Sequence, residues 1–166
     1  MDNPKFDEFI KITKKLNDID IIPLLMGSVG LEVITEKSWY AQDLDIHVPG
    51  DERGWEVPPE LSIYNWSEIV KIMLWMQYSL IDLHEHEFSN GALSVEFGII
   101  DTLPNFAGVR LKDLEIHQME DVKYYLPNPA QYLCIYEASS KDSYRADQNN
   151  NKDSRKIEFL RSILLK

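Results

Sequence analysis

The chain has 166 residues, of which 44% are hydrophobic, and this is enough for one domain with its own core. Its 28 acidic and 17 basic residues give a formal net charge of −11, which argues against broad nucleic-acid binding and against anionic membranes, because both need a basic surface. No stretch approaches the length of a membrane span, the N-terminus carries no apolar signal region, and a single cysteine excludes an internal disulfide. We therefore expect a cytoplasmic protein, with Cys134 buried among apolar neighbours.

The first part of the chain predicts a helix, a strand, a short helix and a second strand. The first helix opens at Asn3–Pro4 and ends at Asn17–Asp18, with apolar residues at helical spacing between them. The apolar run Ile21–Met26 is the first predicted strand, and Ser28 caps a short helix after it. Residues 43–48 alternate between polar and apolar and form the second strand.

The middle of the chain predicts a helix followed by a hairpin. Asn65 and Glu68 have the spacing of a capping box, with Asn65 as the cap. The runs Ile81–Phe88 and Leu93–Ile100 flank Asn90–Gly91, the favoured dipeptide for a two-residue turn.

The last part of the chain predicts short strands and then helices. Residues 109–111 and 114–116 can supply one or two strands, and a helix of about ten residues follows Pro129. Ile157 and Leu160 belong to a final helix. The fold class is α+β, a mixed β-sheet with helices packed mainly on one side, in a single domain over residues 1–166 that ends in a helical segment of about 129–166.

The second strand carries the chemistry. Side chains alternate between the faces of a strand, so Asp43, Asp45 and His47 share one face. Gly27–Ser28 follows the first strand as a turn that can approach a phosphate group closely. Carboxylates two residues apart on one strand can both point at a magnesium ion, which prefers oxygen ligands.

The hairpin offers a third carboxylate. A two-residue turn at Asn90–Gly91 would set Glu85 opposite Glu96 on a polar face. Asp101 has the parity of the apolar residues of that strand, so it would face the core unless a bulge shifts it. We therefore favour Glu96 over Asp101.

These residues resemble the nucleotidyltransferase superfamily, which has the DNA polymerase beta-like fold. The resemblance rests on Gly27–Ser28 and on Asp43-Leu44-Asp45, with a later acidic residue on another strand, and it is strongest to small antibiotic and minimal nucleotidyltransferases. In that family the Gly-Ser turn contacts the triphosphate, and the carboxylates hold two magnesium ions. The chain departs from the pattern in its long spacer before Asp43 and in having Ala41–Gln42 where related sequences often have Arg and Ser.

The resemblance implies a magnesium-dependent enzyme that moves a nucleoside monophosphate from a nucleoside triphosphate to a hydroxyl group. The acceptor is unknown and can be a small molecule, an RNA or a protein. Asp43, Asp45 and Glu96 would be the catalytic metal ligands, with Gly27 and Ser28 at the nucleotide. Lys152 resembles a lysine near the triphosphate in C-terminal segments of such enzymes, although it also fits a charged helix face.

Two other functions remain open. The first is a catalytically inactive, antitoxin-like binding or regulatory module with the same fold, whose acidic surface and tryptophans would suit a protein partner. The second is a metal hydrolase that uses Asp43, Asp45 and His47. His84 and His86 have the spacing of a zinc pair, but their face is otherwise apolar, which favours core or interface histidines.

Overall fold

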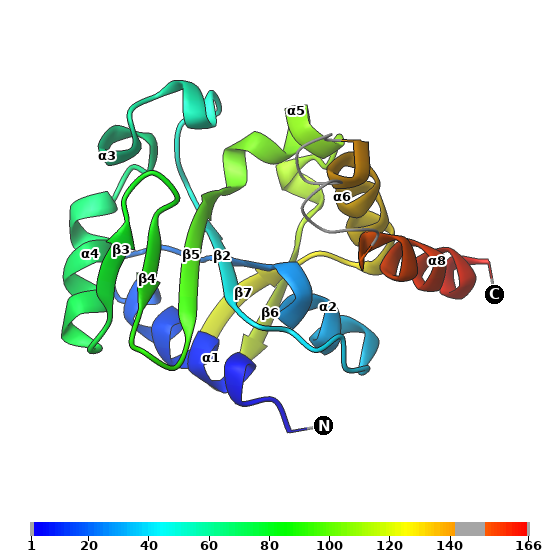
Figure 1. Cartoon of the computed structure of the whole chain (residues 1–166), viewed down its shortest axis with the longest axis horizontal. Coiled ribbons are helices and arrows are strands. Elements are labelled where there is room, and N and C mark those ends of the chain that lie inside the picture. The colour runs from blue at the N-terminus through cyan, green and yellow to red at the C-terminus, as the bar shows by residue number, and fades with distance from the viewer. Residues whose placement is uncertain (1, 142–151, 166) are drawn as a thin grey trace.

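The computed structural model describes residues 2–141 and 152–165. Within these residues seven strands form one mixed sheet in the order β3-β4-β5-β2-β1-β7-β6 (Figure 1). The central strand pair β1 and β2 is antiparallel, while β2 pairs with β5, and β1 with β7, in parallel. The strand bounds are β1 Leu24–Met26, β2 Leu44–Val48, β3 Ser79–Asp82, β4 Glu87–Ser89, β5 Ser94–Ile99, β6 Glu115–Met119 and β7 Val122–Leu126.

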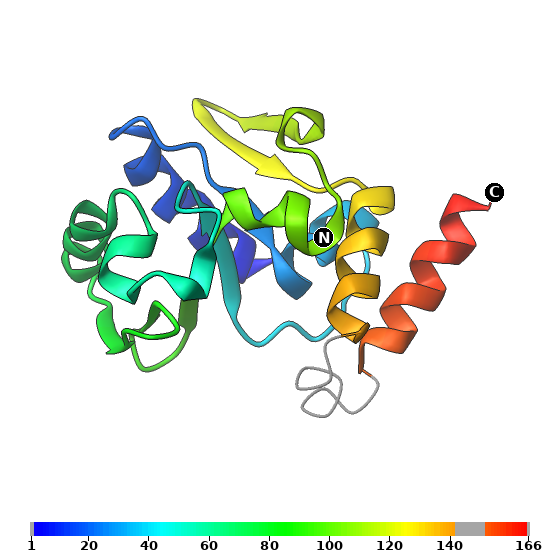
Figure 2. The same ribbon diagram turned by 90° about the horizontal axis from the view of Figure 1, so that it is seen from above.

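The helices gather at the two ends of the sheet and across one face. Figure 2 shows α6 and α8 side by side at one end of the molecule, with α3 and α4 at the other. The helix bounds are α1 Pro4–Asn17, α2 Gly27–Thr35, α3 Pro59–Ser62, α4 Trp66–Trp75, α5 Leu103–Ala107, α6 Pro129–Lys141 and α8 Lys152–Leu164.

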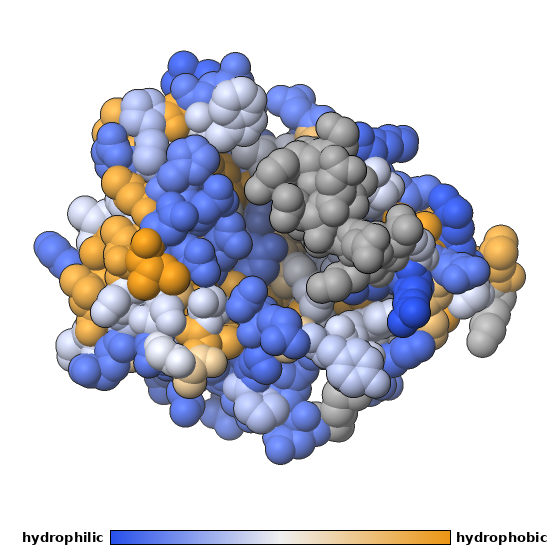
Figure 3. All heavy atoms as spheres, in the orientation of Figure 1, coloured by the Kyte–Doolittle hydropathy of each residue, from blue (hydrophilic) through white to orange (hydrophobic). Residues whose placement is uncertain are grey.

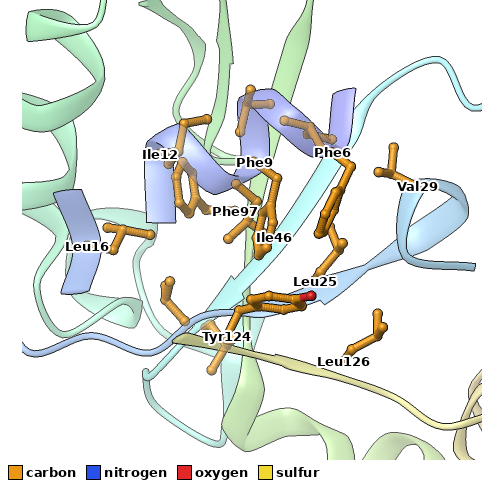
Figure 4. Close-up of a cluster of buried hydrophobic side chains, with 14 of the residues drawn as sticks. Phe6, Phe9, Ile12, Leu16, Leu25, Val29, Ile46, Phe97, Tyr124 and Leu126 are labelled. Atoms are coloured by element: carbon orange, nitrogen blue, oxygen red, sulfur yellow. The ribbon is translucent and has the colours of Figure 1, made fainter. Parts of the chain in front are cut away.

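Helix α1 covers the core face of the central strands. Its start is fixed by Asn3, whose side chain accepts a hydrogen bond from the backbone N–H of Phe6 at 3.1 Å. The apolar side chains of α1 recur at helical spacing and pack on inward-facing residues of β1, β2, β5 and β7 (Figure 4). The labelled members of this core are Phe6, Phe9, Ile12, Leu16, Leu25, Val29, Ile46, Phe97, Tyr124 and Leu126.

The opposite face of the sheet is only partly covered. Leu24 and Met26 of β1 pack there against a second apolar cluster, which includes Leu103 of α5 and Ile135 of α6. On the neighbouring strands β2 and β5 this face carries polar residues instead, among them Asp45 and Glu96. The alternation of each strand thus buries one face and leaves carboxylates on the other.

The face of the molecule seen in Figure 3 is mainly hydrophilic, with hydrophobic residues gathered where β3 and β4 lie. Ile81 is 56% exposed there, next to the partly exposed Leu80 and Leu83. Among the described residues, no helix has both the length and the apolar character that crossing a membrane requires.

The hairpin forms, but its register differs from the prediction. The predicted strand over Ile81–Phe88 is interrupted by a turn at residues 83–86, so that β3 and β4 are separate strands. The loop between β4 and β5 is longer than two residues, because the Asn90 side chain accepts hydrogen bonds from the backbone N–H groups of Ala92 and Leu93. Glu96 consequently pairs with Glu87, and the prediction that it faces Glu85 across the strands is wrong.

Three further local predictions need correction. Residues 111–113 form a short 3-10 helix rather than a strand, and the strand pair that follows, β6 and β7, extends beyond the predicted segment. Neither Ser28 nor Asn65 makes a side-chain cap, although α2 and α4 start next to them. Cys134 is exposed, because it lies on the outer side of α6.

Candidate active site

The turn at Gly27 lies directly against Asp45. Met26, the last residue of β1, pairs with Asp45 of β2. Gly27 follows with a φ of +66°, which favours glycine, and a Cβ added to it would stand 3.0 Å from the Cβ of Asp45. A glycine is needed here both for the backbone conformation and for the close approach of the turn to the carboxylate.

Ser28 lies at the N-terminus of α2, which carries a partial positive charge, and a lysine side chain contacts it. Lys156 of α8 donates a hydrogen bond from Nζ to the Ser28 Oγ at 2.9 Å. Its side chain is only 13% exposed and lies 3.9 Å from the carboxylate of Asp153. A helix N-terminus and a lysine side chain together form an environment that suits an anionic group such as phosphate.

The sequence pointed to Lys152 for this position. Lys152 is the first residue of α8, and its side chain lies outside the described residues. Lys156 stands one helical turn further on, and residues four apart share a helix face. Spacing alone could therefore have indicated either lysine, and only the packing of α8 selects Lys156 as the residue at Ser28.

Asp45 and Glu96 are neighbours across β2 and β5. The two strands run parallel with Asp45 in register with Glu96, and Glu87 of β4 lies on the other side of Glu96. Partial loss of solvent and the charge of Asp45, followed by a hydrogen bond to Glu85 and the charges of Glu85 and Glu87, raise the pKa of Glu96 to about 8. Glu96 keeps an exposed surface, and the carboxyl groups of Asp45, Glu85 and Glu87 surround it. Several carboxyl groups are thus concentrated at this point of the sheet.

His47 lies on the same face and contacts Asp45. Its Nε2 is 3.3 Å from Asp45 Oδ1, and its ring covers Gly98, where an added Cβ would stand 2.7 Å from His47 Cδ2. The other ring nitrogen, Nδ1, is buried and has no hydrogen-bond partner among the described residues. The histidine therefore packs flat on β5 beside the carboxylates.

The other two predicted carboxylates lie elsewhere. Asp43 sits in an exposed bend one residue before β2. Asp101 accepts a hydrogen bond from the backbone N–H of Gly50 at 2.9 Å, so it ties the chain after β5 to the chain after β2. Across residues 2–141 and 152–165, no three His, Cys, Asp or Glu side chains converge on a position for a metal ion. Asp45 and Glu96 are thus brought together without a third ligand at the same point.

Glu32 organises the long spacer before Asp43. Its carboxylate is buried on α2 and accepts hydrogen bonds from the backbone N–H groups of Trp39 at 2.8 Å and Ala41 at 3.3 Å, and from the Asn3 side chain at 3.2 Å. A carboxylate that accepts several N–H bonds fixes the backbone that donates them. A lone acidic residue in an apolar helix was the available signal for this role in the sequence.

The comparisons with known proteins agree with this fold. No family model matches the sequence. A crystal structure of an antigenic nucleotidyltransferase-like protein from Paracoccidioides brasiliensis superposes with a TM-score of 0.59 at 13% sequence identity, over 96% of this chain and 77% of that one. The fold is therefore nucleotidyltransferase-like, and at this identity the likeness concerns the fold alone.

Sequence similarity is higher to a bacterial protein. The chain is 36% identical over 163 residues to the uncharacterized protein YnaI of Bacillus subtilis (strain 168), and the match covers 96% of this chain and 97% of YnaI. Identity at this level over nearly the whole of both chains means that this protein belongs to the same family as YnaI.

Proposed function

We propose that this protein is a magnesium-dependent nucleotidyltransferase, which transfers a nucleoside monophosphate from a nucleoside triphosphate to a hydroxyl group. The observation that carries the proposal is the placement of a phosphate-binding environment, Ser28 with Lys156, one strand away from the paired carboxylates Asp45 and Glu96. Anion-binding and cation-binding groups on adjacent strands suit a metal–triphosphate complex better than either group alone. A nucleoside triphosphate substrate would place the protein in the cytoplasm.

The carboxylates fit magnesium by donor type and by number. Magnesium is usually held by one or two carboxylates together with substrate phosphates and water, so Asp45 and Glu96 suffice from the protein side. The negative charge crowded around Glu96 would be offset by such a cation. Asp43 would contribute from the bend that precedes β2. Bound magnesium would stabilise the charge that develops on the phosphate oxygens.

The protein groups would divide the reaction between them. Ser28, Lys156 and the N-terminus of α2 would hold the β- and γ-phosphates, and Gly27 lets the backbone approach them. The acceptor oxygen forms a bond to the α-phosphorus while the bond from that phosphorus to the bridging oxygen breaks, so pyrophosphate leaves with the electron pair. Glu96 would accept the hydroxyl proton in its ionised form.

Calorimetric titration with ATP, GTP, CTP and UTP in magnesium buffer tests nucleotide binding. We expect Lys156→Met to weaken binding about tenfold or more, because a hydrogen bond from a charged group is lost. Arg155→Gln is the matched control, since Arg155 is an exposed neighbour on the same helix. Binding that is unaffected by Lys156→Met would overturn the assignment of the phosphate site.

Transfer itself is tested with α-labelled triphosphates and a cell extract. Asp43→Asn and Asp45→Asn should abolish magnesium-dependent transfer of label while the circular dichroism spectrum stays unchanged. Asp121→Asn, in the exposed turn between β6 and β7, serves as control. Full activity in the Asp45→Asn variant would remove the proposal.

A second candidate is the catalytically inactive binding or regulatory module. It is favoured by the long spacer before Asp43 and by Ala41–Gln42 in place of Arg and Ser before the first aspartate. The titration and the label-transfer assay together separate the two functions, because an inactive module would bind no nucleotide in magnesium buffer or would bind it without transferring label.

A further inference from the structure

The two edges of the sheet differ in regularity. Strand β3 forms one edge, and its pairing with β4 shifts by one residue at Ile81, between the pairs Leu80–Phe88 and Asp82–Glu87. A bulge of this kind protects an edge against pairing with another strand. Strand β6 forms the other edge, and its five residues pair with β7 in continuous antiparallel register. Of the two edge strands, only β6 therefore offers a regular edge.

The outer side of β6 is open. Four of its five residues are exposed, and Ile116 is 54% exposed. In the described parts of the chain, residues 115–119 make no backbone hydrogen bonds other than those to β7. Figure 2 shows β6 and β7 (yellow-green and yellow) along the upper rim of the molecule. A strand edge in this position can accept a further strand.

The pairing inside the sheet determines which backbone groups of β6 point outward. Tyr125 of β7 donates its N–H to the carbonyl oxygen of Pro23, on the β1 side, at 2.8 Å. In an antiparallel pair, residues that bond to the neighbouring strand alternate with residues that point away from it. Tyr125 points away from β6, so Ile116, which pairs with it, points away from β7. The outward N–H and C=O groups are therefore those of Ile116 and, two residues further on, Gln118.

The side chains of β6 are complementary to those of a second β6. With Ile116 on a two-fold axis, Glu115 of each copy lies opposite His117 of the other copy, in the pairs whose side chains stand closest. The His117 ring stacks on Tyr124 with the centroids 5.6 Å apart, and an imidazole N–H can donate to a carboxylate. An axis at His117 would instead set two histidines together and Glu115 opposite Met119. The side-chain chemistry thus favours the register centred on Ile116.

We propose that a second copy of this chain binds here, with the two β6 strands antiparallel about a two-fold axis at Ile116. The two Ile116 residues exchange a pair of backbone hydrogen bonds, and each Gln118 N–H donates to the Leu114 carbonyl oxygen of the other copy. Asn128 donates to Oε2 of Glu115, so Oε1 faces the histidine of the other copy. The sheet then continues through both copies, and this pairing does not depend on the proposed transferase function.

The size of the contact limits its strength. Each copy contributes little more than one strand, so the buried area stays below the about 1,200 Å² at which stable complexes begin. We expect a reversible dimer with a dissociation constant of about 10–100 μM.

Sedimentation velocity of the full chain from about 5 to about 500 μM tests the association. The weight-average mass should rise from that of one chain toward that of two. Ile116→Lys should raise the dissociation constant at least about tenfold, because two lysines then meet at the axis. Ile81→Lys on the opposite edge strand is the matched control, since Ile81 is 56% exposed. A mass that stays at one chain throughout, or equal effects of the two variants, would overturn the proposal.

Cross-linking tests the register. In a Cys134→Ser background, which removes the single natural cysteine, Ile116→Cys should be cross-linked by bismaleimidoethane, because Cα atoms in such a pair are about 5.5 Å apart. Gln118→Cys points to the same side of β6, but its two copies lie about 14 Å apart along the strands and should not be linked. Equal yields from the two variants, or a higher yield from Gln118→Cys, would contradict the axis at Ile116.

Discussion

At the scale of single residues, partial burial and then the crowding of carboxylates raise the pKa of Glu96. Its pKa of about 8 in the folded chain compares with an ordinary value of 4.5. Between pH 4.5 and pH 8 the folded chain holds a proton on Glu96 that the unfolded chain has released. The contribution of Glu96 to the free energy of unfolding therefore falls as the pH rises through this range.

Glu96→Gln should remove the part of the fall in stability with rising pH that is due to Glu96, because glutamine does not titrate. The variant should gain in melting temperature over the natural chain between pH 5 and pH 8.5, by about 3 °C, an amount reduced by solvent screening of the exposed carboxyl group. The measurement is thermal unfolding followed by circular dichroism in EDTA, with Glu120→Gln as control. A difference between variant and natural chain that is the same at both pH values would contradict the pKa of Glu96.

The residues of this site could be predicted only in part from the sequence. The alternation of β2 placed Asp45 on the polar face, and the parity of β5 did the same for Glu96 while sending Asp101 elsewhere. The predicted hairpin register was off by two residues, which preserves the face of every side chain. The partner of Ser28 could not be derived, because the position of α8 depends on packing between residues that lie far apart in sequence.

At the scale of elements, the segment between α2 and β2 is held by one buried carboxylate. The Glu32 carboxylate accepts hydrogen bonds from the backbone N–H groups of Trp39 and Ala41. These bonds fix the path of the chain as it approaches Asp43. The long spacer before the first aspartate is accommodated in this way. Helix α2 connects the Gly27–Ser28 turn at its start with the segment that leads to Asp43.

Glu32→Ala should release the segment from α2. The amide hydrogens of Trp39 and Ala41 should exchange with solvent at least about tenfold faster, because two donors lose their acceptor. Glu32→Gln retains one acceptor oxygen and should give intermediate rates, and Glu52→Ala, in an exposed loop, should give none of this change. Hydrogen exchange followed by NMR measures the exchange rates of both amides. Unchanged rates in Glu32→Ala would contradict the conclusion that Glu32 holds this segment in place.

Strand β7 was not predicted from the sequence, although its residues have the pattern of a strand. Residues 122–126 alternate between buried and less buried positions, with Val122, Tyr124 and Leu126 on the core side, after a turn at residues 120–121. This is the pattern of a half-buried strand. Its parallel pairing with β1 across about a hundred residues of chain could not be derived from local pattern.

At the scale of the whole molecule, the core joins the N-terminal helix, the sheet and the last helix. Leu160 of α8 is fully buried in the same apolar cluster as Phe9 of α1 and Ile46 of β2. A shared core predicts that these parts unfold together as one domain.

Leu160→Ala should lower the free energy of unfolding by about 2–5 kcal/mol, the usual cost of such a core truncation. Leu165→Ala should change it by less than about 0.5 kcal/mol, because Leu165 is 87% exposed. Urea unfolding monitored by tryptophan fluorescence and by circular dichroism gives both values. Separate transitions for the two signals would mean that α8 unfolds independently of the sheet.

The contact between Ser28 and Lys156 also has a consequence for synthesis of the chain. The two residues are 128 positions apart, so the turn at Ser28 is made early and its lysine arrives only after nearly all of the described chain has left the ribosome. Contacts at such separation form late in folding, because a long loop must close first. A nascent chain that already contains the sheet would therefore lack one side of the proposed phosphate site, and the proposal implies that nucleotide affinity appears only when α8 docks.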